Sequence, residues 1–344
     1  MSKRQLNRRQ RWRIEKIQQE RLARAAKKQH QAEADIAHDL EPPQTGLLVA
    51  HHGQKVLIEA EDGNRHVCHF RANLLHMVVG DEVIWQAPKS PGDGVVVALA
   101  KRKTVLKRPD YYGRLKPVAA NIDQIFITFA PAPIPSTQLI DRYLVAAELA
   151  GITPVLLLNK ADLIDPELEE YFAETERMYR HLGYDVLRAS ATSATGLEAL
   201  HQRLKGKTSA FVGQSGVGKS SLVNALLPEA NLNTQGLSST SGLGQHTTTT
   251  ALLFHLPKGG RLIDSPGIRE FGLWHIDEHE LLAGYPELAN LAGECRFRNC
   301  THRHEPGCAW QNAVAEGKVH AERLDNFFRI ADTLDSHQRQ RYHD

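Results

Sequence analysis

The sequence lacks long hydrophobic segments. Apolar runs such as residues 155–158 are far shorter than the roughly 20 residues that a membrane-spanning helix requires. The N-terminus is basic, but it is not followed by the apolar segment that a secretory signal contains. We therefore expect a cytoplasmic protein with no membrane partner.

Cysteine is scarce and net charge is small. The 344 residues include four cysteines, three of which lie between positions 295 and 308. That distribution does not suit a disulfide framework and indicates a metal site in a reducing compartment. The net charge is only +2, so affinity for nucleic acid must come from local patches. The length allows two or three domains.

What the sequence does contain is a phosphate-binding loop at 213–220, Gly-Gln-Ser-Gly-Val-Gly-Lys-Ser. A β-prone run (208–212) precedes it and a helical apolar pattern (221–227) follows, so a glycine-rich turn without a ligand is the weaker alternative. Lys219 would contact the β- and γ-phosphates, and Ser220 would bind Mg²⁺. The residues predicted to bind nucleotide here are Gly213, Gln214, Ser215, Gly216, Val217, Gly218, Lys219, Ser220 and Ser221, with a catalytic role for Lys219.

A second motif, at 159–162, follows the strand predicted at 154–158 and suits a guanine base. The Asp162 carboxylate can accept from N1–H and from the 2-amino group of guanine, and adenine offers neither donor. The Lys160 stem can lie over the base, and Asn159 can brace the neighbouring loop. Backbone N–H groups of the loop at 190–192 would bind the guanine oxygen, although a polar loop without a ligand is also possible. The predicted guanine-binding residues are Asn159, Lys160, Ala161, Asp162, Ser190 and Ala191.

Two further segments are expected to respond to the γ-phosphate. Asp264 ends a predicted strand at 261–263 and would hold Mg²⁺ through water, while the Gly267 amide would contact the γ-phosphate. The long polar segment 228–245 leads into a run of threonines. One of these would complete the Mg²⁺ coordination, and we favour Thr248 over Thr247.

The residue that activates water is not the usual one. Many GTPases use a glutamine directly after the Asp-x-x-Gly motif, but Ile268 stands there in this chain and cannot hydrogen-bond. His246, just before the threonines, is the candidate, because a neutral imidazole can position water or accept its proton. The alternative is a surface histidine without a catalytic role.

Three thiols and one imidazole lie close together near the C-terminus. Cys295, Cys300, His302 and Cys308 form the ligand set of a tetrahedral Zn²⁺ site, with His304 as an alternative to His302. Four protein ligands leave no open position, so we expect a structural role for one Zn²⁺ per chain. A short knuckle with so few apolar residues requires a metal in order to fold.

The segment 41–102 contains short β-like runs separated by turn residues. Asp62-Gly63 is a strong hairpin signal between the second and third runs. Five such strands predict a small barrel of the OB type, with an SH3-like barrel as the alternative. The strands are expected at 47–50, 55–59, 66–70, 82–85 and 95–99.

After a basic connector at 101–116, strands and helices are expected to alternate. The domain 103–276 should therefore form a mostly parallel sheet with helices on both faces. Residues 277–344 combine the zinc knuckle with helices at 309–316 and 318–334. The strands are expected at 124–129, 154–158, 185–187, 208–212, 251–256 and 261–263.

Basic side chains concentrate at the two ends of the chain. Between Lys3 and Lys28 there are eleven Lys or Arg residues and two Glu residues. We expect residues 1–40 to be a flexible arm that contacts nucleic-acid phosphates, or else a solvated tail. In the knuckle, the arginines at 296, 298 and 303 could contact rRNA phosphates.

Taken together, the loops resemble those of translation-factor-related GTPases in circularly permuted order, because the guanine motif precedes the phosphate loop. With the barrel before and the Cys/His cluster after, residues 40–335 resemble the ribosome small subunit-dependent GTPase A family (RsgA/YjeQ). The resemblance implies a GTP hydrolase that acts late in maturation of the small (30S) ribosomal subunit. It also implies binding near the decoding region of the rRNA, with hydrolysis stimulated by the subunit and coupled to release.

Two other functions remain open at this point. One is a permuted regulatory GTPase with a non-ribosomal partner, and the other is an RNA-binding module whose nucleotide is structural. The basic arm and the arginine-bearing knuckle favour the ribosomal reading over the first. The complete set of magnesium ligands favours it over the second. We expect a monomer that binds GTP, GDP and the small subunit.

Overall fold

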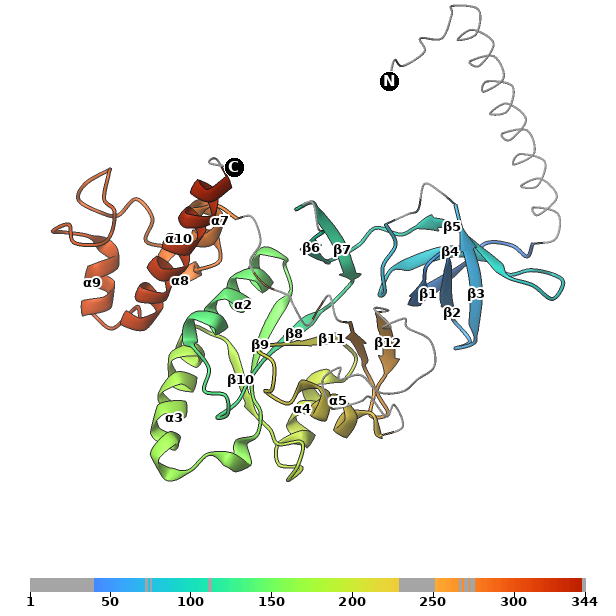
Figure 1. Cartoon of the computed structure of the whole chain (residues 1–344), viewed down its shortest axis with the longest axis horizontal. Coiled ribbons are helices and arrows are strands. Elements are labelled where there is room, and N and C mark those ends of the chain that lie inside the picture. Colours follow the sequence, from blue (N-terminus) through green and yellow to red (C-terminus); the bar gives the residue numbers. More distant parts are fainter. Residues whose placement is uncertain are drawn as a thin grey trace, which may run out of the picture.

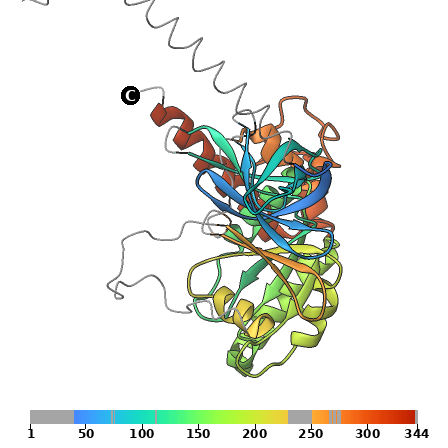
Figure 2. The same cartoon turned by 90° about the vertical axis from the view of Figure 1, so that its right-hand side faces the viewer.

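The chain forms a β-barrel, a central α/β domain and a C-terminal helical domain (Figure 1). The barrel and the C-terminal helices lie at opposite ends of the long axis. Seen from the barrel end in Figure 2, the blue barrel strands lie above the green and yellow α/β domain. The computed structural model describes residues 40–71, 74, 76–110, 113–228, 251–265, 268, 272 and 276–341, with side chains described to 334.

The barrel contains the five strands that the sequence predicts. Strand β1 pairs with both β2 and β4, β3 pairs with β2 and β5, and β4 pairs with β5, so the sheet closes on itself. This order identifies the OB type rather than the SH3-like alternative. A Cβ on Gly46 would lie 2.5 Å from Ile58 and 2.7 Å from Trp85, so the fully buried Trp85 requires glycine there. The strands are β1 (Gln44–His52), β2 (Lys55–Ala60), β3 (Arg65–Phe70), β4 (Glu82–Gln86) and β5 (Gly94–Leu99).

The central sheet is mostly parallel, as expected. Its strand order is β10-β9-β8-β11-β13-β12, and only β12 at the edge runs antiparallel to its neighbour. Parallel neighbours bring their carboxyl ends, and the loops that follow them, to one edge of the sheet. The strands are β8 (Gln124–Phe129), β9 (Thr153–Leu158), β10 (Asp185–Arg188), β11 (Thr208–Val212), β12 (Leu252–His255) and β13 (Arg261–Asp264).

Helices cover both faces of this sheet because its strands are apolar on both faces. In β8, Ile127 packs in the cluster that contains Ile140 and Tyr179, whereas the adjacent Phe126 packs in a second cluster with Leu200 and Leu222. Successive strand residues point to opposite faces, so each face receives its own pair of helices. These are α2 (Thr137–Leu149) and α3 (Pro166–His181) on one face, and α4 (Leu197–Leu204) and α5 (Lys219–Leu226) on the other.

The barrel and the central sheet are joined edge to edge. Ala50 in β1 pairs with Leu252 in β12, so the two sheets form one hydrogen-bonded array. The imidazole of His255 in β12 also lies 2.6 Å from the Glu59 carboxylate in β2. The domain boundaries that the sequence suggests at 102 and 276 stay predictions.

The basic connector predicted at 101–116 contains strands that the sequence analysis does not predict. Strands β6 (Val105–Pro109) and β7 (Leu115–Ala120) pair there as a separate antiparallel hairpin. It is anchored where the Ala120 N–H donates to the Val79 carbonyl at 3.0 Å. The exposed charges of Lys107 and Lys116 obscure the alternation by which a strand is recognised in sequence.

Within the described residues 276–341, four helices follow the central domain. The sequence predicted α9 (Ala309–Ala315) and α10 (Ala321–Arg341) but not the short α7 (Glu278–Ala283) and α8 (Pro286–Ala289). A capping box at Asp277 begins α7. Within the described part of the chain, no helix is long and apolar enough to cross a membrane.

Candidate nucleotide site and metal centre

The phosphate loop joins β11 to α5, as the sequence predicts. Gly213 has φ 136°, and a Cβ there would lie 2.1 Å from the Thr128 carbonyl oxygen, so the loop passes the neighbouring strand too closely for a side chain. The Lys219 ammonium donates to the carbonyls of Gly213 at 2.8 Å and Gln214 at 2.7 Å. These neutral acceptors hold the cation over the loop, where a phosphate can replace them.

Asn159 connects the guanine motif to the phosphate loop. Its Nδ2 donates to the Val217 carbonyl at 2.8 Å, and a Cβ on Gly218 would lie 2.4 Å from the same nitrogen. The Asn159 side chain is buried, and within the described residues its Oδ1 has no hydrogen-bond partner. Since an unpaired buried acceptor is costly, Oδ1 is available to a donor on a bound ligand.

The rest of the guanine motif lies at the same edge of the sheet. Lys160 has φ 57°, and its Nζ donates to the Ala132 carbonyl at 2.8 Å. Ala161 donates its N–H to the Ala189 carbonyl at 3.1 Å, which joins this loop to the one that follows β10. Asp162 is exposed in a short 3₁₀ turn (Ala161–Leu163), where its carboxylate can meet a ligand.

The loop at 190–192 has one backbone N–H left for a ligand. The Ser190 N–H donates to Thr195 at 2.9 Å, and the Ser190 hydroxyl accepts from the Thr192 N–H at 3.2 Å. Among the described contacts, the N–H of Ala191 has no acceptor. Ala191 rather than Ser190 is therefore placed to bind a carbonyl oxygen, and Ser190 shapes the loop.

Two of the predicted magnesium ligands meet at the end of the central strands. Ser220, at the start of α5, and Asp264, at the end of β13, line the same small cavity as Lys219. Because β11 and β13 are adjacent parallel strands, their following residues converge. A hydroxyl and a carboxylate are the hard oxygen donors that Mg²⁺ prefers. The other predicted residues of this part, His246, Thr247, Thr248 and Gly267, lie outside the described residues.

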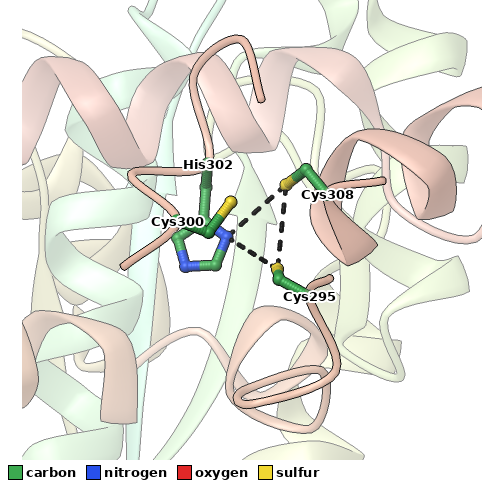
Figure 3. Close-up of side chains that lie close together, drawn as sticks. All are labelled: Cys295, Cys300, His302 and Cys308. Atoms are coloured by element: carbon green, nitrogen blue, oxygen red, sulfur yellow. Dashed lines mark hydrogen bonds between the residues drawn. The ribbon is translucent and has the colours of Figure 1, made fainter. Parts of the chain in front are cut away.

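Three thiols and one imidazole converge in the C-terminal domain and form a candidate metal centre (Figure 3). Their ligand atoms lie within 4.8 Å of one another. His302 Nδ1 is 3.3 Å from the Cys295 sulfur and 3.5 Å from the Cys308 sulfur, and the two sulfurs are 4.0 Å apart. A tetrahedral Zn²⁺ site requires about 3.6 Å and about 3.8 Å for these separations. The residues Cys295, Cys300, His302 and Cys308 therefore fit zinc, and the exposed His304 lies outside the group.

Sequence reasoning missed the residues that support this centre. The Trp310 ring stacks on His302 with centroids 3.7 Å apart, and Gln311 donates to the His302 carbonyl at 2.9 Å. Burial lowers the pKa of His302, which keeps its imidazole neutral near pH 7, as metal ligation requires. Trp310 also packs edge-on against Phe327 in α10, so the centre is attached to that helix.

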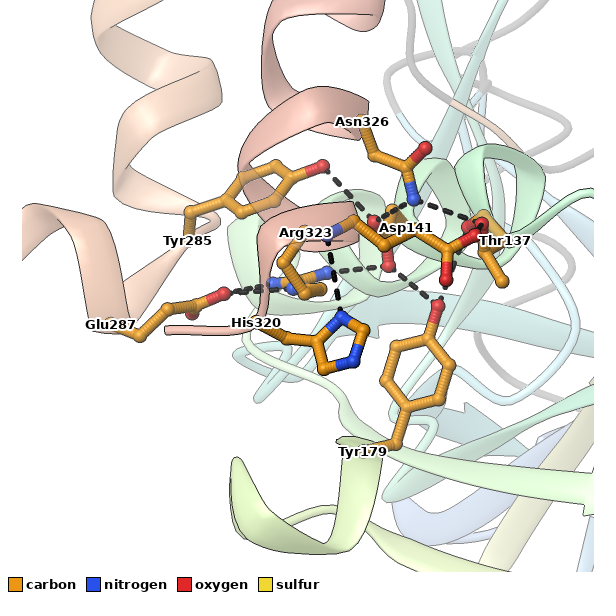
Figure 4. Close-up of polar contacts among 9 residues, drawn as sticks. Thr137, Asp141, Tyr179, Tyr285, Glu287, His320, Arg323 and Asn326 are labelled. Atoms are coloured by element: carbon orange, nitrogen blue, oxygen red, sulfur yellow. Dashed lines mark hydrogen bonds and ion pairs between the residues drawn. The ribbon is translucent and has the colours of Figure 1, made fainter. Parts of the chain in front are cut away.

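A buried polar network joins the C-terminal domain to α2 (Figure 4). Asp141 in α2 binds Arg323 at 2.5 Å and Asn326 at 2.8 Å, and it accepts from Tyr179 at 2.8 Å. Glu287 is 2.7 Å from the other side of the guanidinium. Helical periodicity places both Asp141 and Arg323 on the buried faces of their helices, which indicates that each is buried but not that they pair.

The same helix α2 begins at the phosphate loop. A small cavity lies between Gln214 and Val217 of that loop and Ser136 and Leu139 at the start of α2. Helix α2 thus faces the phosphate loop across this cavity at its N-terminus and binds the C-terminal domain further along.

Comparison with known proteins agrees with this arrangement. A model of the family described as RsgA GTPase matches residues 99–274. A protein of Alcanivorax borkumensis named "Small ribosomal subunit biogenesis GTPase RsgA" is 61% identical over 348 residues, covering 99% of each chain. A protein of Ectopseudomonas mendocina with the same name is 55% identical over 339 residues, covering 97% of this chain and 98% of the relative.

Two solved structures share the fold. YjeQ from Thermotoga maritima superposes with a TM-score of 0.71 and 33% identity, covering 85% of this chain and 99% of that chain. YloQ, described as a circularly permuted GTPase, superposes with a TM-score of 0.69 and 29% identity, covering 86% of this chain and 96% of that chain. The permuted order of loops, the phosphate loop and the full-length relatives agree, and the chain therefore belongs to the RsgA GTPase family.

Proposed function

We propose that this protein hydrolyses GTP during biogenesis of the small ribosomal subunit. The observation that carries the proposal is the hydrogen bond from Asn159 to Val217, which joins a guanine-type loop to a phosphate loop in one site. The family and the names of its full-length relatives support the same reaction and the same partner.

The nucleotide lies along the edge where the central strands end. Asp162 and the Ala191 N–H recognise the guanine edge, and Asn159 braces the phosphate loop beneath it. Glycine-rich backbone N–H groups and the start of α5 hold the β- and γ-phosphates. Ser190 shapes the loop that carries Ala191. The residues proposed to contact GTP are Asn159, Lys160, Ala161, Asp162, Ala191, Gly213, Gln214, Ser215, Gly216, Val217, Gly218, Lys219, Ser220, Ser221, Asp264 and Gly267.

Hydrolysis transfers the γ-phosphoryl group to water and leaves GDP and phosphate. Lys219 exchanges its two carbonyl acceptors for phosphate oxygens and stabilises the charge that develops there. Mg²⁺, when bound, neutralises charge on the β- and γ-phosphates, and Ser220, Asp264 and Thr248 are its proposed ligands. His246 positions the attacking water, because Ile268 has no polar side chain and is buried.

The metal centre serves a structural role. Cys295, Cys300, His302 and Cys308 hold one Zn²⁺ per chain, and they leave it no open position for a substrate. The centre is attached to α10, which binds α2 through Arg323. This connection transmits the nucleotide state from the phosphate loop to the C-terminal domain.

The partner is the 30S subunit late in its maturation, bound through rRNA near the decoding region. The subunit stimulates hydrolysis, and hydrolysis releases the protein. A protein with this partner acts as a monomer in the cytoplasm. The names of the relatives and the basic segments at both ends of the chain support this proposal.

Hydrolysis of GTP with and without purified small subunits, at two salt concentrations, tests the proposal. Stimulation should fade as salt increases, because contacts with rRNA phosphates release counterions. Lys219→Ala is the matched control and should abolish turnover. Asp162→Asn should lower affinity for GTP and raise affinity for xanthosine triphosphate, whose 2-oxygen accepts from an amide. Equal affinity for ATP and GTP in the unaltered chain would contradict the assignment.

A further inference from the structure

Phe297 is an exposed aromatic residue between Cys295 and Cys300 of the zinc knuckle. Its side chain is 42% exposed, and it is not among the apolar residues that pack against the core. Other aromatic residues of this domain, such as Trp310 and Phe327, are buried. Phe297 therefore leaves a large part of an apolar ring exposed to water.

The backbone that carries Phe297 is held in place. Two proposed zinc ligands, Cys295 and Cys300, flank it, and the Cys300 N–H donates to the Phe297 carbonyl at 3.2 Å. The Arg296 N–H donates to the Gly307 carbonyl at 3.1 Å, and a Cβ on Gly307 would lie 3.1 Å from Arg296. An aromatic ring on such a support loses little conformational entropy when a partner covers it.

The surroundings of the ring are cationic. The guanidinium carbon of Arg296 lies over the Phe297 ring at 5.4 Å from its centroid, and Arg298, the next residue along the chain, is exposed. Within the part of the chain that the structure describes, no carboxylate forms an ion pair with Arg296 or Arg298. The nearby Glu305 is engaged by the hydroxyl and the N–H of Thr301. Arg303, in contrast, forms an ion pair with Asp332 in α10 at 2.5 Å and does not belong to this group.

We propose that Arg296, Phe297 and Arg298 form a binding site for an unpaired RNA base. The base stacks on the face of Phe297 that Arg296 does not cover, and the two guanidinium groups contact the adjacent phosphates. Stacking on aromatic side chains and pairing with cations is the general chemistry by which proteins bind single-stranded nucleic acid. A base inside a duplex has no free face, so the site selects a loop, a bulge or a strand end. The inference rests on the proposed function, since that function supplies the RNA.

Binding of short RNA to the full-length zinc-loaded chain tests the site. One probe is a single-stranded RNA that carries one 2-aminopurine, and the other is a duplex of the same sequence. A length of about 10 nucleotides lies within the range that proteins binding single strands cover. Phe297→Leu should weaken binding of the single strand by roughly 5- to 150-fold and abolish the quenching of 2-aminopurine. Phe297→Tyr should retain both. Binding of the duplex should not change in either variant.

Two further variants separate stacking from charge and from general surface effects. Arg298→Gln should weaken binding and lower the slope of log K against log salt by about 1, because one phosphate contact is lost. Phe297→Leu should leave that slope unchanged. Leu149→Ala removes an apolar side chain of similar exposure, 41%, at the end of α2 and should change nothing.

The outcomes distinguish this inference from the function on which it rests. Stimulation of hydrolysis by small subunits, together with equal binding of single strands by Phe297→Leu and the unaltered chain, would overturn the stacking site alone. The stacking site alone would also be overturned if subunits stimulate hydrolysis but the unaltered chain does not bind the single strand. Absence of both RNA binding and stimulation would overturn the proposed function as well. Zinc content measured on each variant confirms that the knuckle is intact.

Discussion

Arg323 in α10 and Asp141 in α2 form an ion pair in which neither side chain is exposed to solvent. The guanidinium also lies over the Tyr285 ring at 4.1 Å and contacts Glu287. Two charges removed from water are tolerated only when each has partners, so the position of α10 on α2 is fixed by electrostatics as well as by packing. The C-terminal domain is therefore packed firmly against the central domain.

Replacing one member of this pair should destabilise the joint strongly and in a pH-dependent manner. In Arg323→Met the Asp141 carboxylate loses its cation, and we expect a loss of about 3–5 kcal/mol at pH 7. Burial already raises the pKa of Asp141 despite Arg323, and removal of the cation raises this pKa further. A carboxyl whose pKa is raised by folding destabilises the fold as pH rises above its unfolded pKa. The loss should therefore be largest at neutral pH and shrink toward pH 4, as measured by urea unfolding followed by tryptophan fluorescence.

The double variant Asp141→Asn/Arg323→Met provides the control. It contains neither charge, so its stability should exceed that of Arg323→Met at pH 7 and should vary less with pH. An equal loss for Arg323→Met at pH 7 and pH 5 would show that Asp141 stays charged without its partner, and would contradict the prediction.

Removing the Asn159 amide should weaken nucleotide binding through the phosphate loop. Asn159→Ala leaves the Val217 carbonyl without its donor, and Val217 is buried. An unsatisfied buried carbonyl costs about 1–3 kcal/mol, which corresponds to a roughly 5- to 150-fold lower affinity for both GTP and GDP. Isothermal titration calorimetry measures the affinity of the variant for each nucleotide. The matched control is Gln202→Ala, which removes an exposed amide bonded to Glu198 on α4 and should bind GTP normally.

Loss of one thiol should disassemble the metal centre and expose Trp310. Cys300→Ser should lower the zinc content, and the emission of Trp310 should shift to longer wavelength, because its stacking on His302 depends on the ligated knuckle. A strong chelator should produce the same shift in the unaltered chain. Cys68→Ala, which changes the buried thiol of the barrel, should retain one zinc per chain. Emission that does not change on chelation would show that the surroundings of Trp310 do not depend on the metal, and would contradict the prediction.

The sequence predicted those parts of the molecule whose signals are local. Strand β8 is predicted at its observed bounds because five apolar or β-prone residues (125–129) stand together after Gln124, and the phosphate loop is a contiguous motif. The OB-type barrel follows from short strands and one clear hairpin at Asp62-Gly63. The four zinc ligands lie within fourteen residues, so their convergence requires no knowledge of the fold.

What could not be predicted depends on contacts between distant residues. Asp141 and Arg323 are separated by 182 positions, and no local pattern in either segment indicates the other residue as its partner. The pairing of Ala50 with Leu252 joins two domains through a single register that no local pattern specifies. The hairpin β6–β7 was missed because its charges hide the alternation, and the role of Ser190 depends on which hydrogen bonds its loop forms.

His246 provides the decisive test of how water is activated, and its role is predicted from sequence alone. His246→Ala should keep GTP affinity, because no phosphate or base contact is assigned to it, but should lower subunit-stimulated kcat by about 10²–10⁴-fold, the usual contribution of a general base. Thr247→Ala, one residue away, serves as the neighbouring control and should affect kcat less if Thr248 is the magnesium ligand. Stimulated turnover is measured as phosphate release at saturating GTP and subunit. Turnover equal to that of the unaltered chain would mean that water is positioned by a group from the partner, since Ile268 cannot replace the imidazole.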